Sequence, residues 1–528
     1  MRLSFLATGT AGLLWLGVAM GIGTMSPEDA RLDRKRLEKI TQDLQMQVSR
    51  NQLPGAAFQV YRAGKLVFQD AVGYQDRELL RPMGMDTIVR LMSQTKPLVA
   101  AGIMILMERG LLKLDDPLWK YHPKFRHMDV LNWDRTKATV PANRDITILD
   151  LLLHTAGLGY SGGFNDPNGG GPLETLQLPF QSLDTFMDDL ADKALFWQPG
   201  TTWRYSWSYD VLGYVIKRIT KQTPDDWLRQ NLFVPLQMYD TDFYVPMSKI
   251  DRFAVAYTMT PGEILIPIIR PRMDPLQAFR PPTFLSCGSG IVSTLYDYGR
   301  FALMLLNGGE LDGVRILQSA TVDMMWRNNL DVSLLPMDLN GWKSDMNTGW
   351  GFGFTVSAPE PLPGVDWSKH TGANRTGSIG WGGGMMTNWI ASADNDLLVL
   401  FATQRLATPI PNTFQDIVVE GVMKSIKGDS PRKIPGPEGP AVDYEVDDGT
   451  NHAGGGNGNN RGFGGMGRAA VPLNPLPGLW GNQWMQTDQG ELLASLAQEQ
   501  AKWTETQQEA AAEMEATKAK TLLRNNNA

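Results

Sequence analysis

Residues 91–102 read LMSQTKPLVAAG, in which a serine, a lysine three positions later and a proline precede an apolar run. Residues three apart share one face of an α-helix, so Ser93 and Lys96 are in contact if a helix begins near Ser93. Pro97 fits such a helix only within its first turn, where the missing N–H costs little. The apolar residues that follow predict a buried helix over 98–109, which Gly110 caps.

The pair Ser93 and Lys96 is either an ordinary helix start or a nucleophile with its base. A serine hydroxyl is a poor nucleophile unless a neighbouring group removes its proton, and a lysine can do so only as a free amine. Burial or nearby positive charge must therefore lower the lysine pKa. A helix N-terminus assists, because its N–H groups favour an alkoxide and its dipole disfavours an adjacent cation. Alone, however, the pattern S-x-x-K often occurs by chance.

The composition restricts the possible partners. The chain has 528 residues and a net charge of −7, without a basic block suited to a phosphate backbone, so nucleic acid is not an expected partner. The one cysteine, Cys287, excludes internal disulfides and a cysteine-based zinc site. The five histidines show no metal-ligand spacing. We therefore expect no metal, no cofactor and a small-molecule substrate; the oligomeric state is not indicated.

The two ends of the chain differ from its body. Residues 1–26 hold one arginine before an apolar stretch, which resembles a secretory leader or a short membrane anchor. This favours a secreted or membrane-associated protein with possible membrane contact; an untargeted extension on a cytoplasmic protein is the alternative, because the run is marginal for a full span. Residues 428–488 are rich in Gly, Pro and Asn and predict a flexible, disordered linker, and residues 489–528 predict a polar C-terminal helix.

Residues 33–427 predict one domain in which helices and strands alternate. GAAFQVYRAGKLVFQDAVGY (55–74) indicates two strands around a turn at 63–65, and NWIASADNDLLVLFATQ (388–404) indicates a hairpin with its turn at 394–396. Helices are expected at 98–109, 146–154, 208–220 and 294–306. Strands at both ends with helices between them predict an α+β (mixed α/β) fold, with an antiparallel sheet built from both ends of the domain and a helical insertion.

Two further stretches carry chemistry. PGTTWRYSWSYDVLGYVIKRIT (199–220) indicates a turn, an extended segment ending near Tyr205 and a helix from about Ser208. A tyrosine at that junction is placed to project into a cleft and relay a proton. GSIGWGGGMMTNWIA (377–391) puts small residues before and into a terminal strand, where three glycines let a substrate lie against the backbone and leave an N–H to bind an oxyanion.

Together these motifs resemble the serine β-lactamase-related hydrolases, which include class C β-lactamases, D-alanyl-D-alanine peptidases, β-lactamase-like carboxylesterases and related acyltransferases. The resemblance covers about residues 35–427 and rests on motifs in the expected order: SQTK, LLLHTAGL (151–158), PGTTWRYS, DVLG, GSGIVSTLYDYGRFALMLLNGGELDGVRIL (288–317) and GWGGG. It implies a β-lactamase/transpeptidase-like fold, a nucleophile at Ser93, a base at Lys96 and assistance from Tyr205. It places the oxyanion hole at the backbone N–H groups of Ser93 and Gly384.

Two departures from the lactamase pattern indicate the branch of the family. The motif Y-x-N reads Y-S-W at 205–207, and K-T-G or H-T-G reads W-G-G at 381–383. An asparagine amide and a lysine suit the amide and the carboxylate of a lactam, whereas an indole offers one N–H donor and no charge. A neutral, apolar acyl ester is the better match, and the carboxylesterase and acyltransferase branches commonly show W-x-G. The predicted substrate-binding residues are Trp207, Trp381, Gly382 and Gly383.

Two other motifs compete with these assignments. A literal H-T-G stands at 370–372, but its surroundings have a loop-like composition, so the W-G-G at 381–383 is favoured. The stretch GYSGG (159–163) matches G-x-S-x-G around Ser161. That motif requires a strand before the serine and a helix after it, and the flanking residues indicate a loop instead.

Two side chains offer alternative roles. His154, four residues after Asp150, would fit a Ser-His-Asp triad, but no serine is placed by the same motifs. Tyr209 is the rival of Tyr205, yet it falls on the apolar stripe of the helix at 208–220 and is expected to pack.

The expected function is therefore that of a serine hydrolase that cleaves carboxylic esters through an acyl-enzyme on Ser93. An acyltransferase that uses a second alcohol, or a β-lactamase or D-amino peptidase, is the alternative within the family. From a different class, a catalytically inactive scaffolding member would retain the fold alone; the intact Ser93, Lys96 and Tyr205 argue against it.

Overall fold

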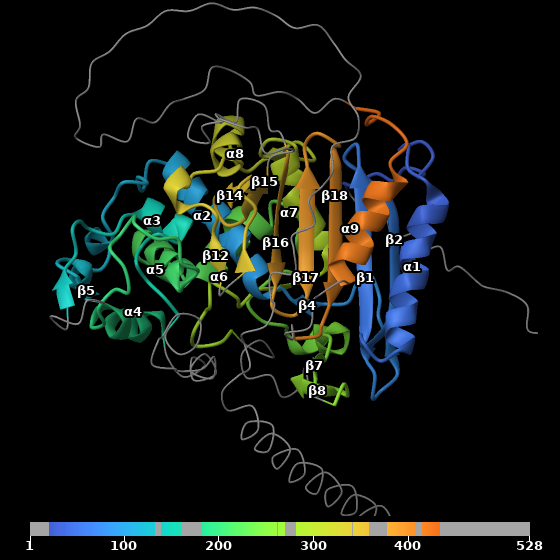
Figure 1. The fold of residues 1–528 in the computed structure, drawn as a ribbon, viewed down its shortest axis with the longest axis horizontal. Helices are drawn as coiled ribbons and strands as arrows, with labels where there is room; N and C mark the ends of the chain where they lie inside the picture. Colours follow the sequence, from blue (N-terminus) through green and yellow to red (C-terminus); the bar gives the residue numbers. More distant parts are fainter. Residues whose placement is uncertain are drawn as a thin grey trace, which may run out of the picture.

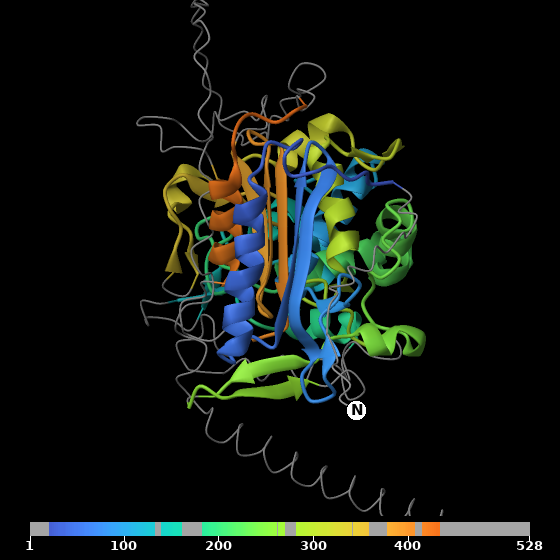
Figure 2. The same ribbon diagram turned by 90° about the vertical axis from the view of Figure 1, so that its right-hand side faces the viewer.

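A computed structural model describes residues 21–132, 139–160, 182–260, 262–269, 281–339, 342–357, 377–406 and 414–432. The centre is an eight-stranded sheet in the order β14-β15-β16-β17-β18-β1-β2-β3, in which every neighbouring pair is antiparallel. Helices α1 and α9 pack together on one face of this sheet, and α7 lies on the other face (Figures 1 and 2). Helices α2 and α5 pack together in the helical part of the domain, on the same side as α7. The site lies where this helical part meets β16.

The helices of the described residues are α1 (Arg34–Ser49), α2 (Thr95–Glu108), α3 (Ile148–Leu153), α4 (Leu183–Ala191), α5 (Ser208–Thr220), α6 (Pro224–Leu228), α7 (Leu295–Leu306), α8 (Ser319–Met325) and α9 (Phe414–Ser425). The strands of the large sheet are β1 (Gly55–Arg62), β2 (Lys65–Asp76), β3 (Arg81–Pro82), β14 (Thr348–Trp350), β15 (Thr355–Ser357), β16 (Ser378–Gly383), β17 (Thr387–Ser392) and β18 (Leu397–Thr403).

Two-stranded pairs surround this sheet. They are β4 (Val89–Arg90) with β9 (Val292–Ser293), β5 (Asp129–Leu131) with β6 (Thr139–Pro141), β7 (Ala256–Met259) with β8 (Leu265–Ile269), β10 (Glu310–Leu311) with β11 (Val314–Arg315), and β12 (Asp338–Leu339) with β13 (Trp342–Lys343).

Both predicted hairpins are confirmed. The turn between β1 and β2 holds Ala63 at φ 54° and Gly64 at φ 71°, as a two-residue hairpin turn requires. β18 of the second hairpin pairs with β1, with Phe58 opposite Phe401, so the two ends of the domain complete one sheet. All residues of β1 and β18 are buried, because helices cover both faces of these central strands. The α+β fold class is therefore confirmed.

The predicted helices are also found, with ends shifted by up to three residues. α2 begins at Thr95 rather than at 98, and its residues are buried from Thr95 to Leu106, so it forms the core of the helical part. Gly110 follows its end at φ 67° and donates its N–H to the Met107 carbonyl, as expected of a cap.

Several predictions lie outside the described residues. These are most of the leader at 1–26, nearly all of the linker, the C-terminal helix, Ser161 and the H-T-G at 370–372. Within the described part of the chain, no helix is long and apolar enough to cross a membrane.

Candidate active site

Ser93 lies on a single 3-10 turn, η1 (Met92–Gln94), which leads directly into α2. Met92 adopts φ 50°, a left-handed conformation that is uncommon for a side chain of this size. The preceding residue holds this turn in place: the Leu91 N–H donates to the Ile291 carbonyl (3.0 Å), and the Leu91 carbonyl accepts from Thr387 Oγ1 (3.1 Å). Ser93 is thus presented from a sharp bend that is fixed on both sides.

Lys96 is buried beside the serine. Its Nζ lies 3.3 Å from Ser93 Oγ, donates to the Gly288 carbonyl at 2.8 Å and stands 4.4 Å above the Tyr205 ring. Burial lowers the pKa of Lys96 to about 7, although the nearby negative charge of Asp210 acts in the opposite direction. A substantial fraction of this lysine is therefore a free amine near neutral pH, which is the state that a base for Ser93 requires.

Tyr205 lies in the segment just ahead of α5, with its hydroxyl close to the same serine. Burial raises the pKa of Tyr205, while hydrogen bonds from Ser93 and Trp381 lower it. The Trp381 Nε1 donates to the phenol oxygen at 3.1 Å. At neutral pH Tyr205 is a neutral phenol, so it can take a proton from Ser93 only while it passes its own proton on.

Trp381 was predicted to contact the substrate, and the structure gives its side chain another contact. The indole on β16 is fully buried, packs against the rings of Tyr205 (5.5 Å) and Trp350 (4.6 Å), and orients the phenol through its N–H. A contact between this residue and a substrate stays a prediction.

The glycines at the end of β16 bring this strand against the Ser93 turn. A Cβ on Gly383 would lie 2.1 Å from the Leu91 carbonyl oxygen, so glycine is needed for the chain's own packing there. At Gly384 the nearest atom to such a Cβ is Met92 Cε at 3.8 Å, which leaves that side of the backbone open. The predicted oxyanion donor Gly384 therefore follows a strand that touches the serine turn, and Gly382 lies opposite Asn388 within the sheet.

Trp207 occupies the last position before α5. Its ring packs edge-on against Tyr160 (4.7 Å) and Phe186 (5.5 Å) and is largely buried. In place of the amide of a Y-x-N motif, the site has an apolar aromatic wall next to Tyr205.

The alternative triad does not form. Asp150 binds Arg144 and Thr155, whereas His154 Nδ1 accepts the Ser206 N–H at 3.2 Å. Burial, together with the charge of Lys96, keeps the pKa of His154 well below its usual range, so this imidazole is neutral. Its ring packs against the Tyr205 ring, with the centroids 4.5 Å apart and the ring planes tilted by 40°, and supports that ring. Its neighbour on α5, Tyr209, is buried and donates to the Leu152 carbonyl, which agrees with the predicted packing role.

The sequence reasoning missed the groups that hold Lys96. Asp210 is fully buried in α5, and the Gly288 carbonyl accepts from the lysine. The motif DVLG contains Asp210 but does not by itself indicate a role for it; the available signal was a carboxylate inside the apolar stretch YDVLGYVI. Nothing in the spacing indicates Gly288, which lies far along the chain.

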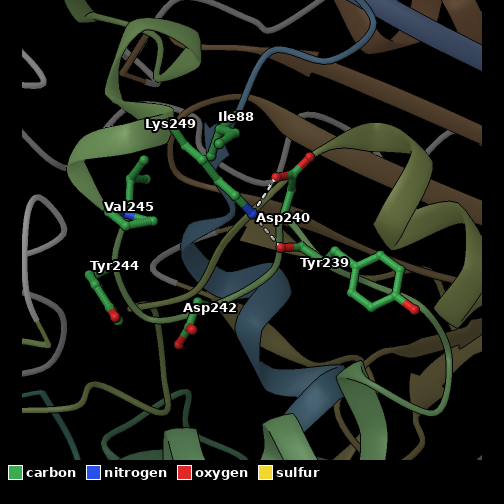
Figure 3. A pocket seen from close by; sticks show the side chains of 8 residues that line it. Ile88, Tyr239, Asp240, Asp242, Tyr244, Val245 and Lys249 are labelled. Carbon is green, nitrogen blue, oxygen red and sulfur yellow. Dashed lines mark hydrogen bonds and ion pairs between the residues drawn. The ribbon is translucent and has the colours of Figure 1, made fainter.

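A polar pocket lies apart from these residues (Figure 3). It is lined in part by Tyr239, Asp240, Asp242 and Lys249. Its carboxylates are paired with cations, for example Asp240 with Lys249 at 2.7 Å, so no chemistry is assigned to it. Among the described residues, no group of three or more His, Cys, Asp or Glu side chains gathers that would hold a metal ion.

The fold and the site are those of one protein family, and comparison with known proteins identifies that family. The Beta-lactamase family model matches residues 35–414. The chain therefore belongs to the β-lactamase family and is a serine hydrolase.

Similar proteins indicate the branch of the family that this chain resembles. Protein Rv1367c of Mycobacterium tuberculosis is 34% identical over 363 residues, which are 67% of this chain and 86% of that protein. Esterase EstB of Burkholderia gladioli is 29% identical over 389 residues, 69% of this chain and 91% of that one. The solved structure of EstCE1, a hydrolase with promiscuous acyltransferase activity, matches with a TM-score of 0.59 and 25% identity, covering 74% of this chain and 98% of that chain. The chain thus resembles the esterase and acyltransferase branch of the family.

Proposed function

We propose that this protein cleaves carboxylic esters through an acyl-enzyme on Ser93. The observation that carries the proposal is the buried Lys96 amine, 3.3 Å from Ser93 Oγ and with a pKa lowered to about 7. The similarity to EstB and to EstCE1, whose names describe an esterase and a hydrolase, supports an ester as the acyl donor.

In the proposed acylation step, Lys96 takes the Ser93 proton, directly or through the Tyr205 phenol. The Ser93 oxygen then forms a bond to the ester carbonyl carbon, and the carbonyl electron pair moves onto its oxygen. The N–H groups of Ser93 and Gly384 stabilise that oxyanion. When it collapses, the bond to the alcohol oxygen breaks, and the alcohol leaves with the proton that Lys96 and Tyr205 return.

The second step decides between hydrolysis and acyl transfer. Water, deprotonated by the same groups, attacks the acyl carbon and releases the acid together with free Ser93. A second alcohol in place of water would yield a new ester. This acyltransferase reaction is the second candidate, and it is favoured by the similarity to EstCE1.

The substrate preference follows from the two tryptophans. We expect short-chain p-nitrophenyl esters to be turned over readily and cephalosporins slowly or not at all, because Trp207 and Trp381 cannot pair with a carboxylate. Loss of one charge-assisted hydrogen bond costs roughly 1.5–3 kcal/mol, or about ten- to a hundredfold in kcat/KM. The measurement is kcat/KM for a p-nitrophenyl ester and a chromogenic cephalosporin on one preparation.

The Ser93→Ala variant serves as the control in this comparison, since it reports the uncatalysed background for both substrates. If the cephalosporin matches or exceeds the ester, the argument from the two tryptophans is wrong.

The hydrogen bond from Trp381 to Tyr205 leads to a smaller expected effect. Trp381→Phe keeps an aromatic ring but removes the N–H, so the phenol loses a donor that orients it. A neutral hydrogen bond contributes about 0.5–1.5 kcal/mol, so kcat/KM should fall by about two- to tenfold.

Trp389 supplies the matched control for this substitution. It lies opposite Trp381 on β17, is equally buried, and its Nε1 has no hydrogen-bond partner among the described residues. Trp389→Phe should therefore keep the native kcat/KM. An equal loss in both variants would show that packing, and not the hydrogen bond to Tyr205, determines the effect.

A further inference from the structure

Lys96 is held by a turn from a distant part of the chain. The turn at 286–290 reads SCGSG and closes on itself through a hydrogen bond from the Gly290 N–H to the Ser286 carbonyl (2.7 Å). Its Gly288 carbonyl accepts from Lys96 Nζ at 2.8 Å. This carbonyl is the contact that directs the amine, so whatever fixes the turn also fixes the base.

Asp210 fixes the turn from the other side. Its Oδ1 accepts from the Gly288 N–H (3.1 Å) and from Ser286 Oγ (2.9 Å). Gly288 therefore donates its N–H to a buried carboxylate while its carbonyl accepts from the buried lysine. Asp210 and Lys96 are linked through the backbone of a single residue.

The packing around the turn leaves little room for movement. A Cβ on Gly288 would lie 2.6 Å from Asp210 Oδ2, and a Cβ on Gly213 of α5 would lie 2.3 Å from Cys287 Sγ. The turn thus packs on α5 at two points: Gly288 lies against the Asp210 carboxylate, and the Cys287 side chain fills the space next to Gly213. Close contact at both points fixes where the Gly288 carbonyl can be.

The residue after the turn extends the same support to the nucleophile. The Ile291 N–H donates to Thr95 Oγ1 (3.1 Å), and the Ile291 carbonyl accepts from the Leu91 N–H (3.0 Å). Leu91 and Thr95 lie on either side of the turn that carries Ser93. A displacement of the segment at 286–291 would therefore change the position of the serine as well as that of the lysine.

We propose that Asp210 is a positioning residue for Lys96: it holds the 286–290 turn so that the Gly288 carbonyl keeps the amine beside Ser93, and it supplies the buried negative charge that is linked to this amine through the Gly288 backbone. This inference rests on the proposed role of Lys96 as the base. Asp210 itself touches neither the serine nor, in this scheme, the substrate.

Among the titratable groups around Lys96, Asp210 is the source of negative charge, because the others are neutral. Tyr205, His154, Cys287 of the turn and Tyr298 of α7, which donates to the backbone before the lysine, face the same region. Burial raises the pKa values of the two tyrosines and the thiol and lowers that of the imidazole, so all four are neutral near pH 7.

Asp210 has partners that favour its ionised form. The pKa of Asp210 is nevertheless raised, because the effect of burial is larger than the opposing effects of the Lys96 charge and the hydrogen bonds from Ser286 and Gly288. In turn, the charge of the carboxylate raises the pKa of Lys96 against the effect of burial. Loss of this charge should make the lysine give up its proton at a lower pH.

The test is the pH dependence of kcat/KM for a p-nitrophenyl ester in Asp210→Asn. Asparagine can still accept from Gly288 and Ser286, but it carries no charge. Activity rises with pH as Lys96 loses its proton, so this acidic limb should move to lower pH by about one unit or more. Ser93→Ala provides the background at each pH, and thermal unfolding reports whether the variant is folded.

Asp297 provides a matched control on α7. It is also a buried carboxylate that accepts from one backbone N–H and one hydroxyl, those of Asp240 and Thr241. It makes no contact with the turn or with Lys96, so Asp297→Asn should leave the acidic limb in its native position.

A second variant tests the turn without removing the charge. Gly288→Ala places a Cβ against the Asp210 carboxylate and should push the turn away, lowering the plateau of kcat/KM by about tenfold or more. This variant decides the matter if Asp210→Asn does not fold, because an unchanged plateau would then contradict the positioning role.

The results separate this inference from the proposed function. A native acidic limb in folded Asp210→Asn overturns the role of Asp210, whatever happens to the plateau. If Ser93→Ala still turns over the ester as fast as the native protein, the proposed function itself is wrong. An inactive Ser93→Ala variant together with an unmoved limb in Asp210→Asn rejects the inference alone.

Discussion

We expect the native protein to gain one covalent adduct from a fluorophosphonate probe, and the Ser93→Ala variant to gain none. The probe forms a bond from phosphorus to Ser93 Oγ as fluoride leaves, and alanine has no atom that can replace this oxygen. Hydrolysis of a p-nitrophenyl ester should fall to the background, a loss on the order of 10⁶-fold in kcat if the enzyme resembles other serine hydrolases that lack their nucleophile. Intact-mass measurement followed by peptide mapping reads out the adduct.

Ser161 provides the control for this experiment, because it lies in the competing G-x-S-x-G pattern. Ser161→Ala should label like the native protein. An adduct mapped to Ser161 would overturn the assignment of the nucleophile and, with it, the proposed mechanism.

The second large effect is expected for Lys96→Arg. Arginine stays protonated at any pH at which the protein is folded, so it keeps a cation at this position but cannot accept the Ser93 proton. Since general base catalysis contributes about 10²–10⁴-fold, kcat should fall by that factor. Steady-state kinetics with the same ester measures the loss, and a variant that keeps more than about a tenth of the native kcat would make Lys96 a structural residue.

Lys249 offers a comparison for the same substitution. Its Nζ binds the Tyr239 carbonyl and Asp240 outside the site. Lys249→Arg keeps the charge and should retain the native kcat. A comparable loss there would indicate that the exchange of lysine for arginine disturbs the fold instead of the chemistry.

Local patterns predicted most of the sheet and the helices. The hairpins of β1–β2 and β17–β18 have turn residues between apolar runs, and α5 begins and ends where its apolar stripe indicated. The contact between Ser93 and Lys96 could be predicted for the same reason, because a spacing of three residues at the start of a helix brings two side chains together. Local patterns did not predict the left-handed conformation of Met92 or the start of α2 at Thr95, closer to the serine than expected. Both depend on packing against distant parts of the chain.

The remaining parts of the site depend on contacts between distant segments. The Gly288 carbonyl lies 192 residues from Lys96, and the Trp381 indole lies 176 residues from Tyr205. No spacing in the sequence indicates either contact. The motifs located these segments, but only the fold shows that Trp381 acts on the tyrosine and that Gly383 accommodates the Leu91 carbonyl.

The contacts that β16 and β17 make with Leu91 have a consequence for the time at which the enzyme becomes active during its synthesis. Leu91, which anchors the turn of the serine, takes a hydrogen bond from Thr387 of β17 and lies against Gly383 of β16. Ribosomes release these strands long after Ser93 itself has emerged. Because contacts of such long sequence separation form late, the nascent chain carries its serine and lysine without a working site until the last strands leave the exit tunnel. A complete site therefore forms only after the domain is nearly complete.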